Sequence, residues 1–261
     1  MTLNSNPRKI KVQGAAFRLH RDYEIRSPVD IAIEDIAMAE DLLVTIGALK
    51  GADGRLVRKG NQGIARISDS IIEPARQKFT ICHEFGHWLL HRDECQFFLC
   101  KEDDMYDYRS DCLEIEANSF AAELLMPKRW IKKSFWELEP SIAKLQEMAS
   151  FFQVSLTAAA LRYVELSKRA CMVVFSDGNN VRWWRKRENL PFWLQSKQRV
   201  DSRSYASECF KTGQKCDGMQ DVEPEAWFLH CDTELSELLE DSIYLQNQEI
   251  LVSLLWFPSY G

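Results

Sequence analysis

The sequence predicts an α+β protein, because it contains both amphipathic helical segments and short β-prone runs bounded by turn residues. Apolar residues recur at helical spacing in residues 28–43, 74–91 and 111–127. β-prone runs flank turn-forming residues near positions 60 and 178. The chain has 261 residues, of which 46% are apolar and 28% charged, so it can bury a substantial core as one large domain or two small ones.

The first elements lie in the N-terminal part of the chain. A helix is predicted over PVDIAIEDIAMAEDLL, residues 28–43, directly after Ser27. The runs GADGRLV and QGIARIS lie on either side of turn residues 59–61 and predict a hairpin or a pair of strands. The second helix begins near Pro74, because proline suits a first helical turn, and continues to about His91.

The middle of the chain begins with a segment that has no clear period. Residues 92–110 mix acidic and aromatic side chains and predict a long loop. DCLEIEANSFAAELLMP predicts a helix over 111–127, with Asp111 as N-cap and Pro127 as its end. Residues 139–169 predict two short helices joined by a turn.

The last part of the chain has the pattern of a small sheet. CMVVFSDGNNVRWW predicts a hairpin, and LVSLLWF predicts a buried final strand. We therefore predict three parts. They are a first domain at 1–135, a helical segment with a helix-turn-helix-like pattern at 136–169, and a small α/β C-terminal domain at 170–261.

The composition narrows the class of protein. The formal charge of −6 and the pI near 5.5 argue against a chain that mainly coats nucleic acid, so direct nucleic-acid binding would have to be local. No apolar signal segment precedes the first helix, and the apolar runs are far shorter than the roughly 20 residues that span a bilayer. We therefore expect a cytoplasmic protein without a membrane partner.

The eight cysteines include no C-x-x-C pair, and we expect reduced thiols rather than disulfides. A structural zinc on Cys95 and Cys100, or on Cys209 and Cys216, is the less expected alternative.

The stretch FTICHEFGHWLLH, residues 79–91, holds three of the chain's five histidines. On a helix, His83 and His87 lie about 40° apart around the axis and one turn apart along it, so one metal ion can bind both. Glu84 points about 100° away from His83, which keeps it off the metal but within reach of a water molecule there, as a general base requires. Gly86 allows another segment to approach closely.

A catalytic zinc site also needs a third protein ligand. The helix at 111–127 offers Glu114 and Glu116, and a helical wheel places Glu114 within or beside the apolar face and Glu116 toward solvent. A buried carboxylate is costly unless it is paired or bound to a metal, so Glu114 is the predicted ligand. Asn118, one turn further on, is a predicted hydrogen-bonding partner of the site.

Two questions stay open at this point. His83 and His87 could be core histidines with Glu114 in a buried salt bridge, although the inward Glu-x-x-x-Asn pattern favours a metal. His91 lies two turns beyond His83, too far along the axis to share the ion with both histidines. We expect it either to serve the C-terminal end of the helix or to contact the substrate.

Three motifs occur in a fixed order along the chain: GRLVRKGNQGIARISDSIIEPARQKFT, then HEFGHWLLH, then EIEANSFAAELLMP. With them, residues 28–127 resemble the ImmA/IrrE family of zinc metallopeptidases. The resemblance implies a zincin-like fold for the domain at 1–135, one zinc ion and a gluzincin-like third ligand at Glu114. It also implies that the substrate is a helix-turn-helix repressor, whose cleavage relieves repression of stress-response or mobile-element genes.

The expected reaction is hydrolysis of a peptide bond, in which Glu84 takes a proton from the attacking water. The strand at 63–68 is expected to hold an extended substrate at a sheet edge. A donor for the oxyanion is expected as well. The candidates for this donor are His91, Tyr106, Tyr108, Arg109 and His230.

Three other functions compete with proteolysis. Residues 142–166 resemble a helix-turn-helix, but the second helix begins with Thr157 and three alanines where base-reading side chains are expected. The run RWWRKR at 182–187 could stack bases and contact phosphates, but a strand with basic residues facing solvent is favoured. The last alternative is a ligand-sensing regulator whose metal site is not proteolytic.

Overall fold

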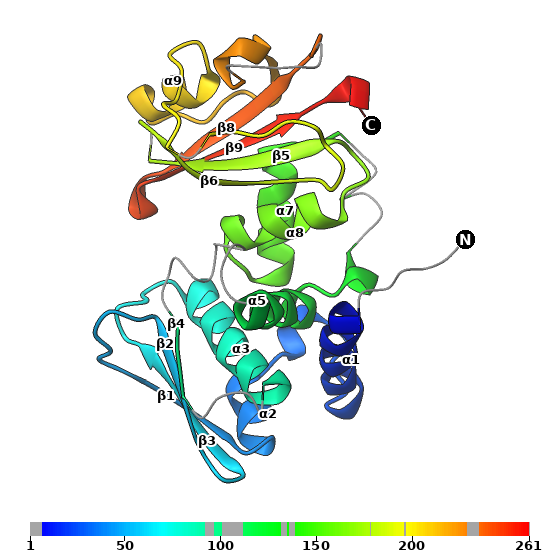
Figure 1. The fold of residues 1–261 in the computed structure, drawn as a ribbon, viewed down its shortest axis with the longest axis vertical. Helices are drawn as coiled ribbons and strands as arrows, with labels where there is room; N and C mark the ends of the chain where they lie inside the picture. The colour runs from blue at the N-terminus through cyan, green and yellow to red at the C-terminus, as the bar shows by residue number, and fades with distance from the viewer. Residues whose placement is uncertain are drawn as a thin grey trace. The chain divides into compact units, whose positions relative to one another are not determined.

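The computed structural model describes residues 7–91, 97–100, 112–131, 135, 139–177, 179–195, 197–228 and 235–260. The chain forms two compact units (Figure 1). Unit 1 comprises Met1–Trp130 with Phe151–Ser155, and unit 2 comprises Ile131–Ser150 with Leu156–Gly261. Each unit combines helices with a β-sheet, which confirms the α+β class. The division into three parts remains a prediction.

Unit 1 contains a four-stranded sheet with the strand order β1-β3-β2-β4. Its strands are β1 (Leu42–Gly47), β2 (Gly54–Lys59), β3 (Gln62–Ser68) and β4 (Phe97–Cys100). The hairpin prediction is confirmed by β2 and β3, which pair antiparallel and turn at Gly60, a glycine with a left-handed φ of +61°. β4 also pairs with β2, so the prediction of an uninterrupted loop over 92–110 is wrong at these four residues.

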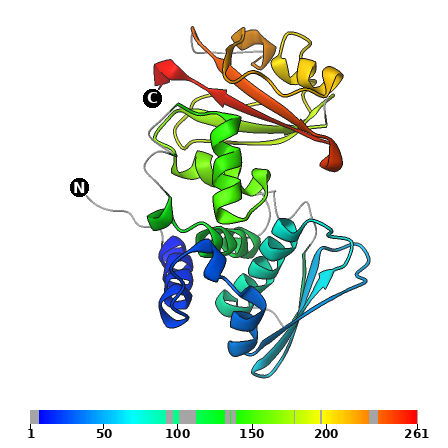
Figure 2. The ribbon, with the colours of Figure 1, turned by 180° about the vertical axis from the view of Figure 1, so that it is seen from behind.

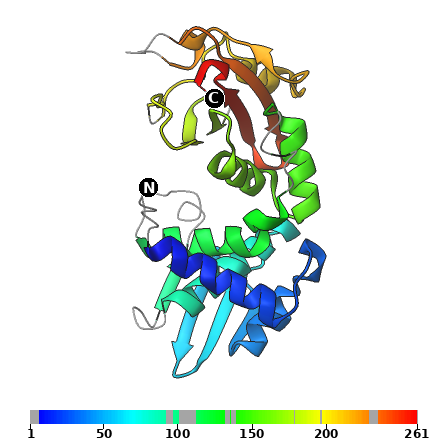
Figure 3. The same cartoon turned by 90° about the vertical axis from the view of Figure 1, so that its right-hand side faces the viewer.

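The helices of unit 1 lie on one side of this sheet (Figure 1). They are α1 (Pro7–Asp22), α2 (Ile33–Ala39), α3 (Pro74–Leu90) and α5 (Cys112–Leu125). α3 packs on β2 and β3, α5 packs on α3, and α1 runs alongside α5 (Figure 3). The predicted helices that begin near Pro74 and that cover most of 111–127 are therefore confirmed.

The predicted helix at 28–43 is wrong in its extent. Pro28–Asp30 forms a 3-10 turn, and α2 covers only Ile33–Ala39. Asp41 then takes a left-handed conformation with φ 64°, and Leu42 already begins β1. Pairing with β3 and the β-branched residues of β1 outweigh the helical spacing of the apolar side chains.

α1 is an addition to the predicted elements. Its sequence, PRKIKVQGAAFRLHRD, is largely polar, and only a narrow stripe of the helix is buried. Val12, Ala16 and Leu19 form this stripe at spacing of three and four residues. Docking of this stripe gives the helix its stability, since propensity alone rarely does so in water.

Unit 2 contains a five-stranded antiparallel sheet with the order β6-β5-β9-β8-β7. Its strands are β5 (Cys171–Ser176), β6 (Val181–Lys186), β7 (Gln220–Asp221), β8 (Leu239–Leu245) and β9 (Ile250–Trp256). The helices are α7 (Ile142–Phe152), α8 (Leu156–Leu166) and α9 (Tyr205–Thr212). These elements confirm the predicted helical pair, the hairpin and the buried final strand.

Two neighbouring carboxylates on β8 anchor helices on opposite faces of this sheet (Figure 2). Glu240 accepts hydrogen bonds from the backbone N–H groups of Tyr205 and Ala206 at the start of α9. Asp241 accepts one from the N–H of Ile142 at the start of α7, at 2.7 Å. Successive side chains of a strand point to opposite faces, so this adjacent pair fixes one helix on each side.

Short 3-10 turns complete the described structure. They are η1 (Pro28–Asp30), η2 (Lys128–Trp130), η3 (Pro224–Ala226), η4 (Gln246–Gln248) and η5 (Pro258–Tyr260). In the described part of the chain, every helix is too short or too polar to cross a bilayer.

Candidate metal centre

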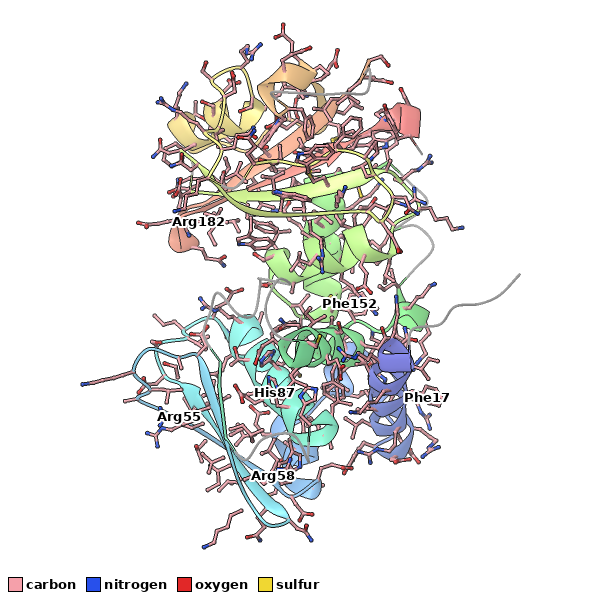
Figure 4. All side chains as sticks on the ribbon, viewed as in Figure 1. Phe17, Arg55, Arg58, His87, Phe152 and Arg182 are labelled. Atoms are coloured by element: carbon pink, nitrogen blue, oxygen red, sulfur yellow. The ribbon has the colours of Figure 1, made fainter. Side chains whose placement is uncertain are left out.

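α3 positions the first two residues of the site. His83 and His87 lie one turn apart on this helix, and both side chains are fully buried. Figure 4 labels His87 on α3. Their ring centroids are 4.7 Å apart, and the two Nε2 atoms are 3.1 Å apart. Helical spacing therefore brings the two imidazoles together as the sequence predicts.

α5 supplies the third residue. The Glu114 Oε2 atom lies 3.1 Å from His83 Nε2, and Oε1 lies 3.3 Å from His87 Nε2. One ligand atom from each of these three side chains lies within 4.8 Å of the others. Two imidazoles and one carboxylate that converge on a common point are the donor set of catalytic zinc sites.

Gly86 explains how α5 comes so close to α3. A Cβ added to Gly86 would lie 3.1 Å from the Ala117 Cα atom and 3.1 Å from a ring carbon of Phe120. About one turn before Ala117, α5 presents Glu114 toward the two histidines. The missing side chain at Gly86 thus permits the helix separation at which the carboxylate reaches both rings.

Asn118 sets the orientation of His83. The His83 Nδ1 atom lies 2.9 Å from the Asn118 Oδ1 atom, which can only accept a hydrogen bond, so Nδ1–H donates to it. The Nε2 lone pair of neutral His83 then faces His87 and Glu114. Asn118 therefore occupies the position predicted for a hydrogen-bonding partner of the site.

Charge interactions inside the site favour an ionised Glu114. Burial raises the pKa of Glu114, but the opposing effect of the neighbouring His83 and His87 is larger and brings that pKa well below its usual range. Burial lowers the pKa of His87 to about 4, against the opposing effect of Glu114. Burial also lowers the pKa of His83, but the interactions with Glu114 and Glu84 outweigh burial, so that the pKa of His83 lies above its usual value. These directions favour an ionised Glu114 carboxylate beside the two imidazoles.

Glu84 lies between α3 and the sheet, next to the start of β2. Its side chain is fully buried, and a Cβ on Gly54 would collide with its carboxylate. Glu84 Oε1 thus packs directly against the Gly54 backbone. A side chain at residue 54 would displace the carboxylate, so the glycine helps define its position.

The structure changes the interpretation of two further residues. Glu116 is 8% exposed and interacts with His91 and Arg8, so the predicted solvent-facing position is wrong. Arg8 belongs to α1, and the helix that lies beside this face of α5 is absent from the predicted elements. His91 caps the end of α3 through its backbone N–H and has a fully buried side chain, which favours its role at the helix end over a substrate contact.

Several predicted residues lie where the structure gives no description, and the predicted edge strand lies inside the sheet. Tyr106, Tyr108, Arg109 and His230 lie outside the described residues, as do Asp111 and Cys95. The prediction that the strand at 63–68 offers a free edge is wrong, because β3 is paired with β1 on one side and with β2 on the other.

The features that suggested nucleic-acid binding have internal roles. Thr157 and the three alanines after it, at the start of α8, are buried. Trp183 stacks on Phe175 with the ring centroids 3.7 Å apart, and the Trp184 Nε1 atom donates a hydrogen bond to the Leu194 carbonyl. These side chains take part in the packing of unit 2.

Comparisons with known proteins place the site in a known domain. Residues 38–163 match the profile of the IrrE N-terminal-like domain, a peptidase family. A protein of Deinococcus deserti named radiation response metalloprotease IrrE is 32% identical over 99 residues, which make up 38% of this chain and 35% of that protein. A protein of the same name from Deinococcus radiodurans is 25% identical over 181 residues, or 59% of this chain and 55% of that protein. The chain thus spans about a third to a little over half of these relatives.

A solved structure supports the fold. A Mycobacterium tuberculosis transcriptional regulator superposes with a TM-score of 0.65 over 95% of this chain and 76% of its own, at 12% sequence identity. At this identity the likeness concerns the fold alone.

The matched domain contains His83, His87 and Glu114, together with the helices that hold them. Over residues 38–163 the chain is therefore similar to the IrrE N-terminal-like domain, and parts of it are similar to two metalloproteases named IrrE.

Proposed function

We propose that this protein is a zinc-dependent endopeptidase. The observation that carries the proposal is the convergence of His83 Nε2, His87 Nε2 and the Glu114 carboxylate, with neighbouring atoms 3.1 to 3.3 Å apart. Three electron-pair donors this close in a buried site repel one another unless a cation lies between them. Two neutral imidazoles and a carboxylate suit zinc and leave a fourth position for water.

Each residue has a defined task in the proposed reaction. His83, His87 and Glu114 hold the ion, which when bound acidifies water and polarises the peptide carbonyl. Glu84 receives the proton of the attacking water and passes it to the leaving amine. Its burial next to Gly54 restricts the position of the carboxylate. Asn118 keeps His83 in the form that binds through Nε2.

The proposed substrate is a helix-turn-helix transcriptional repressor, whose cleavage relieves repression. The similarity to the IrrE N-terminal-like domain and the name of the two relatives, radiation response metalloprotease, support a role in a stress response. The first residues of α8, the second helix of the helix-turn-helix-like pair, are buried, which argues against base reading by these residues.

The test combines metal content with cleavage. The purified full chain is expected to hold close to one zinc ion per chain and to cleave a helix-turn-helix repressor encoded beside its gene. Glu84→Gln should retain zinc and lose cleavage, and Glu114→Gln should lose both. Glu123→Gln, an equal charge change further along α5, should lose neither. Cleavage by Glu84→Gln would reject the assigned general base, and a wild-type chain that does not bind zinc would reject the proposed function.

A further inference from the structure

A chain of three buried side chains leads away from the metal centre on the His87 side. The His87 Nδ1 atom lies 3.0 Å from the His91 Nδ1 atom, and His91 Nε2 lies 3.3 Å from Glu116 Oε2. His87 and His91 are fully buried, and Glu116 is 8% exposed. The proposed reaction uses neither His91 nor Glu116, although both lie beside a proposed ligand.

The chemistry of the three groups fixes where the protons lie. A carboxylate can only accept hydrogen bonds, so the contact with Glu116 requires a proton on His91 Nε2. A neutral imidazole carries one N–H, which leaves a lone pair on His91 Nδ1. His91 Nδ1 therefore accepts a hydrogen bond from the Nδ1–H of His87.

The consequence appears at the other nitrogen of His87. With its proton on Nδ1, His87 presents the Nε2 lone pair toward His83 and Glu114. The reverse arrangement would put a hydrogen on Nε2 and block the position that a metal must take. A carboxylate behind a histidine also raises the electron density of the donor nitrogen, as hydrogen-bonded carboxylates do at metal sites.

We propose that His91 and Glu116 are positioning residues that hold His87 in the Nδ1–H form and so prepare it to bind zinc. Arg8 of α1 contacts the other carboxylate oxygen of Glu116, with its Nε atom 3.4 Å from Oε1, while Oε2 faces His91. The two histidine ligands are thus oriented by different means. Asn118 orients His83 directly, whereas a histidine and a carboxylate orient His87 in sequence. The proposal rests on the proposed metal site but not on any particular substrate.

The test measures zinc affinity in the full-length chain by competition with a chromophoric chelator. His91→Leu removes the acceptor for His87 and should weaken zinc binding about 10- to 100-fold, the usual effect of losing such a partner. His91→Gln can accept from His87 and donate to Glu116, so it should restore most of the lost affinity. Glu116→Gln should weaken binding, whereas Glu123→Gln, with the same charge change on the same helix, should not.

A second measurement needs no variant. In the zinc-loaded wild-type chain, ¹⁵N–¹H spectra of the histidine rings should show a proton on His87 Nδ1 and on His91 Nε2. A proton-free Nδ1 on His87, or unchanged zinc affinity in His91→Leu, would overturn the proposal and leave the proposed function intact. Equal losses in His91→Leu and His91→Gln would show that the residue acts only through packing. A wild-type chain that binds no zinc would overturn both proposals.

A separate observation in unit 2 concerns two cysteines. Cys209 on α9 and Cys216 in the following loop place their Sγ atoms 3.0 Å apart. Gly213, with a left-handed φ of +68°, ends α9 and lets the chain turn back. The carbonyl of Ser242 on β8 accepts a hydrogen bond from the Cys216 backbone N–H at 3.0 Å and lies 3.4 Å from Cys209 Sγ. The two thiols are therefore held together by the fold.

The geometry points to Cys209 and Cys216 as a reversible dithiol–disulfide site. The sulfurs need to approach by only about 1 Å to reach bonding distance, given an S–S bond of about 2.05 Å. The oxidant is a low-molecular-weight disulfide. One protein sulfur attacks it and releases one small thiol, and the other protein sulfur displaces the second, so two thiols leave as one protein disulfide forms. The Cys216 thiol lowers the pKa of Cys209, which favours the thiolate that this exchange requires.

The metal alternative for this pair has less support. The His83, His87 and Glu114 group is the sole cluster of three or more metal-ligating side chains among the described residues, so nothing described adds a third ligand to the cysteines. The buried position of Cys209, which is 3% exposed, and the partial burial of Cys216 protect the bond once it forms.

The test treats the full chain with oxidised glutathione and maps tryptic peptides by mass spectrometry. The peptides that carry Cys209 and Cys216 should be joined, with the loss of two hydrogens, and a reducing agent should separate them. Oxidation should also raise the melting temperature, and Cys209→Ser and Cys216→Ser should abolish this rise, whereas Cys171→Ala should keep it. Free thiols at both positions, or glutathione attached without an internal bond, would overturn the proposal.

Discussion

At the scale of single residues, the geometry of the site depends on two glycines as well as on the proposed metal ligands. Gly54 and Gly86 lie on different elements, and each leaves room for one reactive carboxylate. Gly54 borders Glu84, and Gly86 borders the helix that carries Glu114. The roles of the two carboxylates can therefore be separated by substitutions next to them.

Gly54→Ala should impair catalysis and spare metal binding. The added methyl group collides with the Glu84 carboxylate and leaves the ligand atoms of His83, His87 and Glu114 untouched. We expect at least a roughly tenfold lower cleavage rate, because misplacement of a catalytic group by about 1 Å is costly. Steady-state cleavage and zinc titration measure the two effects. Gly14→Ala, in a helix position with open space, is the control and should match wild type; equal cleavage by Gly54→Ala would contradict the prediction.

Asn118→Ala, in contrast to Gly54→Ala, should weaken zinc binding itself. The Nδ1–H of His83 loses its acceptor, so zinc affinity should fall about tenfold or more, as measured by chelator competition. Asn118→Asp keeps an oxygen in place and should retain tight binding. If the alanine variant binds zinc as the wild type does, Asn118 does not orient the ligand.

At the scale of elements, the site depends on the contact between α3 and α5. Phe85 and Phe120 meet edge to face across it, with ring centroids 5.9 Å apart. The other side of α3 is fixed to β2 by Arg58, whose Nη2 atom donates to the carbonyl of Trp88 at 2.8 Å. The guanidinium of Arg58 also lies 3.7 Å from the centroid of the Trp88 ring. α3 is thus held between the sheet and α5.

Gly86→Ala should separate α3 from α5. Its Cβ meets the Ala117 backbone, which cannot move without a shift of the whole helix. We expect a loss of about 1–3 kcal/mol in the free energy of unfolding, measured with urea, as in other overpacked cores. Zinc affinity should fall as well, because Glu114 moves with α5. A variant with unchanged affinity would show that the helix separation does not set the site.

At the scale of the whole molecule, stability should depend on pH through buried histidines outside the metal centre. His20 is 3% exposed, its Nε2–H donates to the Leu124 carbonyl at 2.8 Å, and its ring lies 4.8 Å from that of Trp130. Burial lowers the pKa of His20 to about 4, and Arg129 also acts downward. In the unfolded chain the same group titrates near 6.5.

The sign of the effect follows from proton uptake. Between pH 6.5 and 4 the unfolded chain binds the additional proton, so acid favours unfolding and the stability supplied by neutral His20 is lost as the pH falls. The contribution is at most about 3.5 kcal/mol, at about 1.4 kcal/mol for each pKa unit between 6.5 and about 4. Urea unfolding of the metal-free chain at a series of pH values should show a shallower dependence for His20→Asn than for wild type. Parallel curves would exclude His20 as the source.

Some elements of the fold could be predicted from the sequence, and others could not. The spacing of His83 and His87 needs only one helix, so the geometry of this pair follows from local structure. The start of α3 and the β2–β3 hairpin follow from proline and turn residues in the same way. The strand β1 could not be predicted from its local sequence. It pairs with β3, which follows β2 in the chain, and this pairing overrides the local helical pattern.

The sequence by itself determined the identity of the proposed ligands and base, because residue type, helical period and the cost of burying a carboxylate act within one helix or between two recognisable ones. Only the tertiary structure decided that Glu116 is buried beside His91, that α1 brings Arg8 to it, and that Gly54 borders Glu84. Each of these contacts joins elements far apart in the chain. Their burial is a property of the packed assembly of helices and sheet, to which local patterns contribute no information.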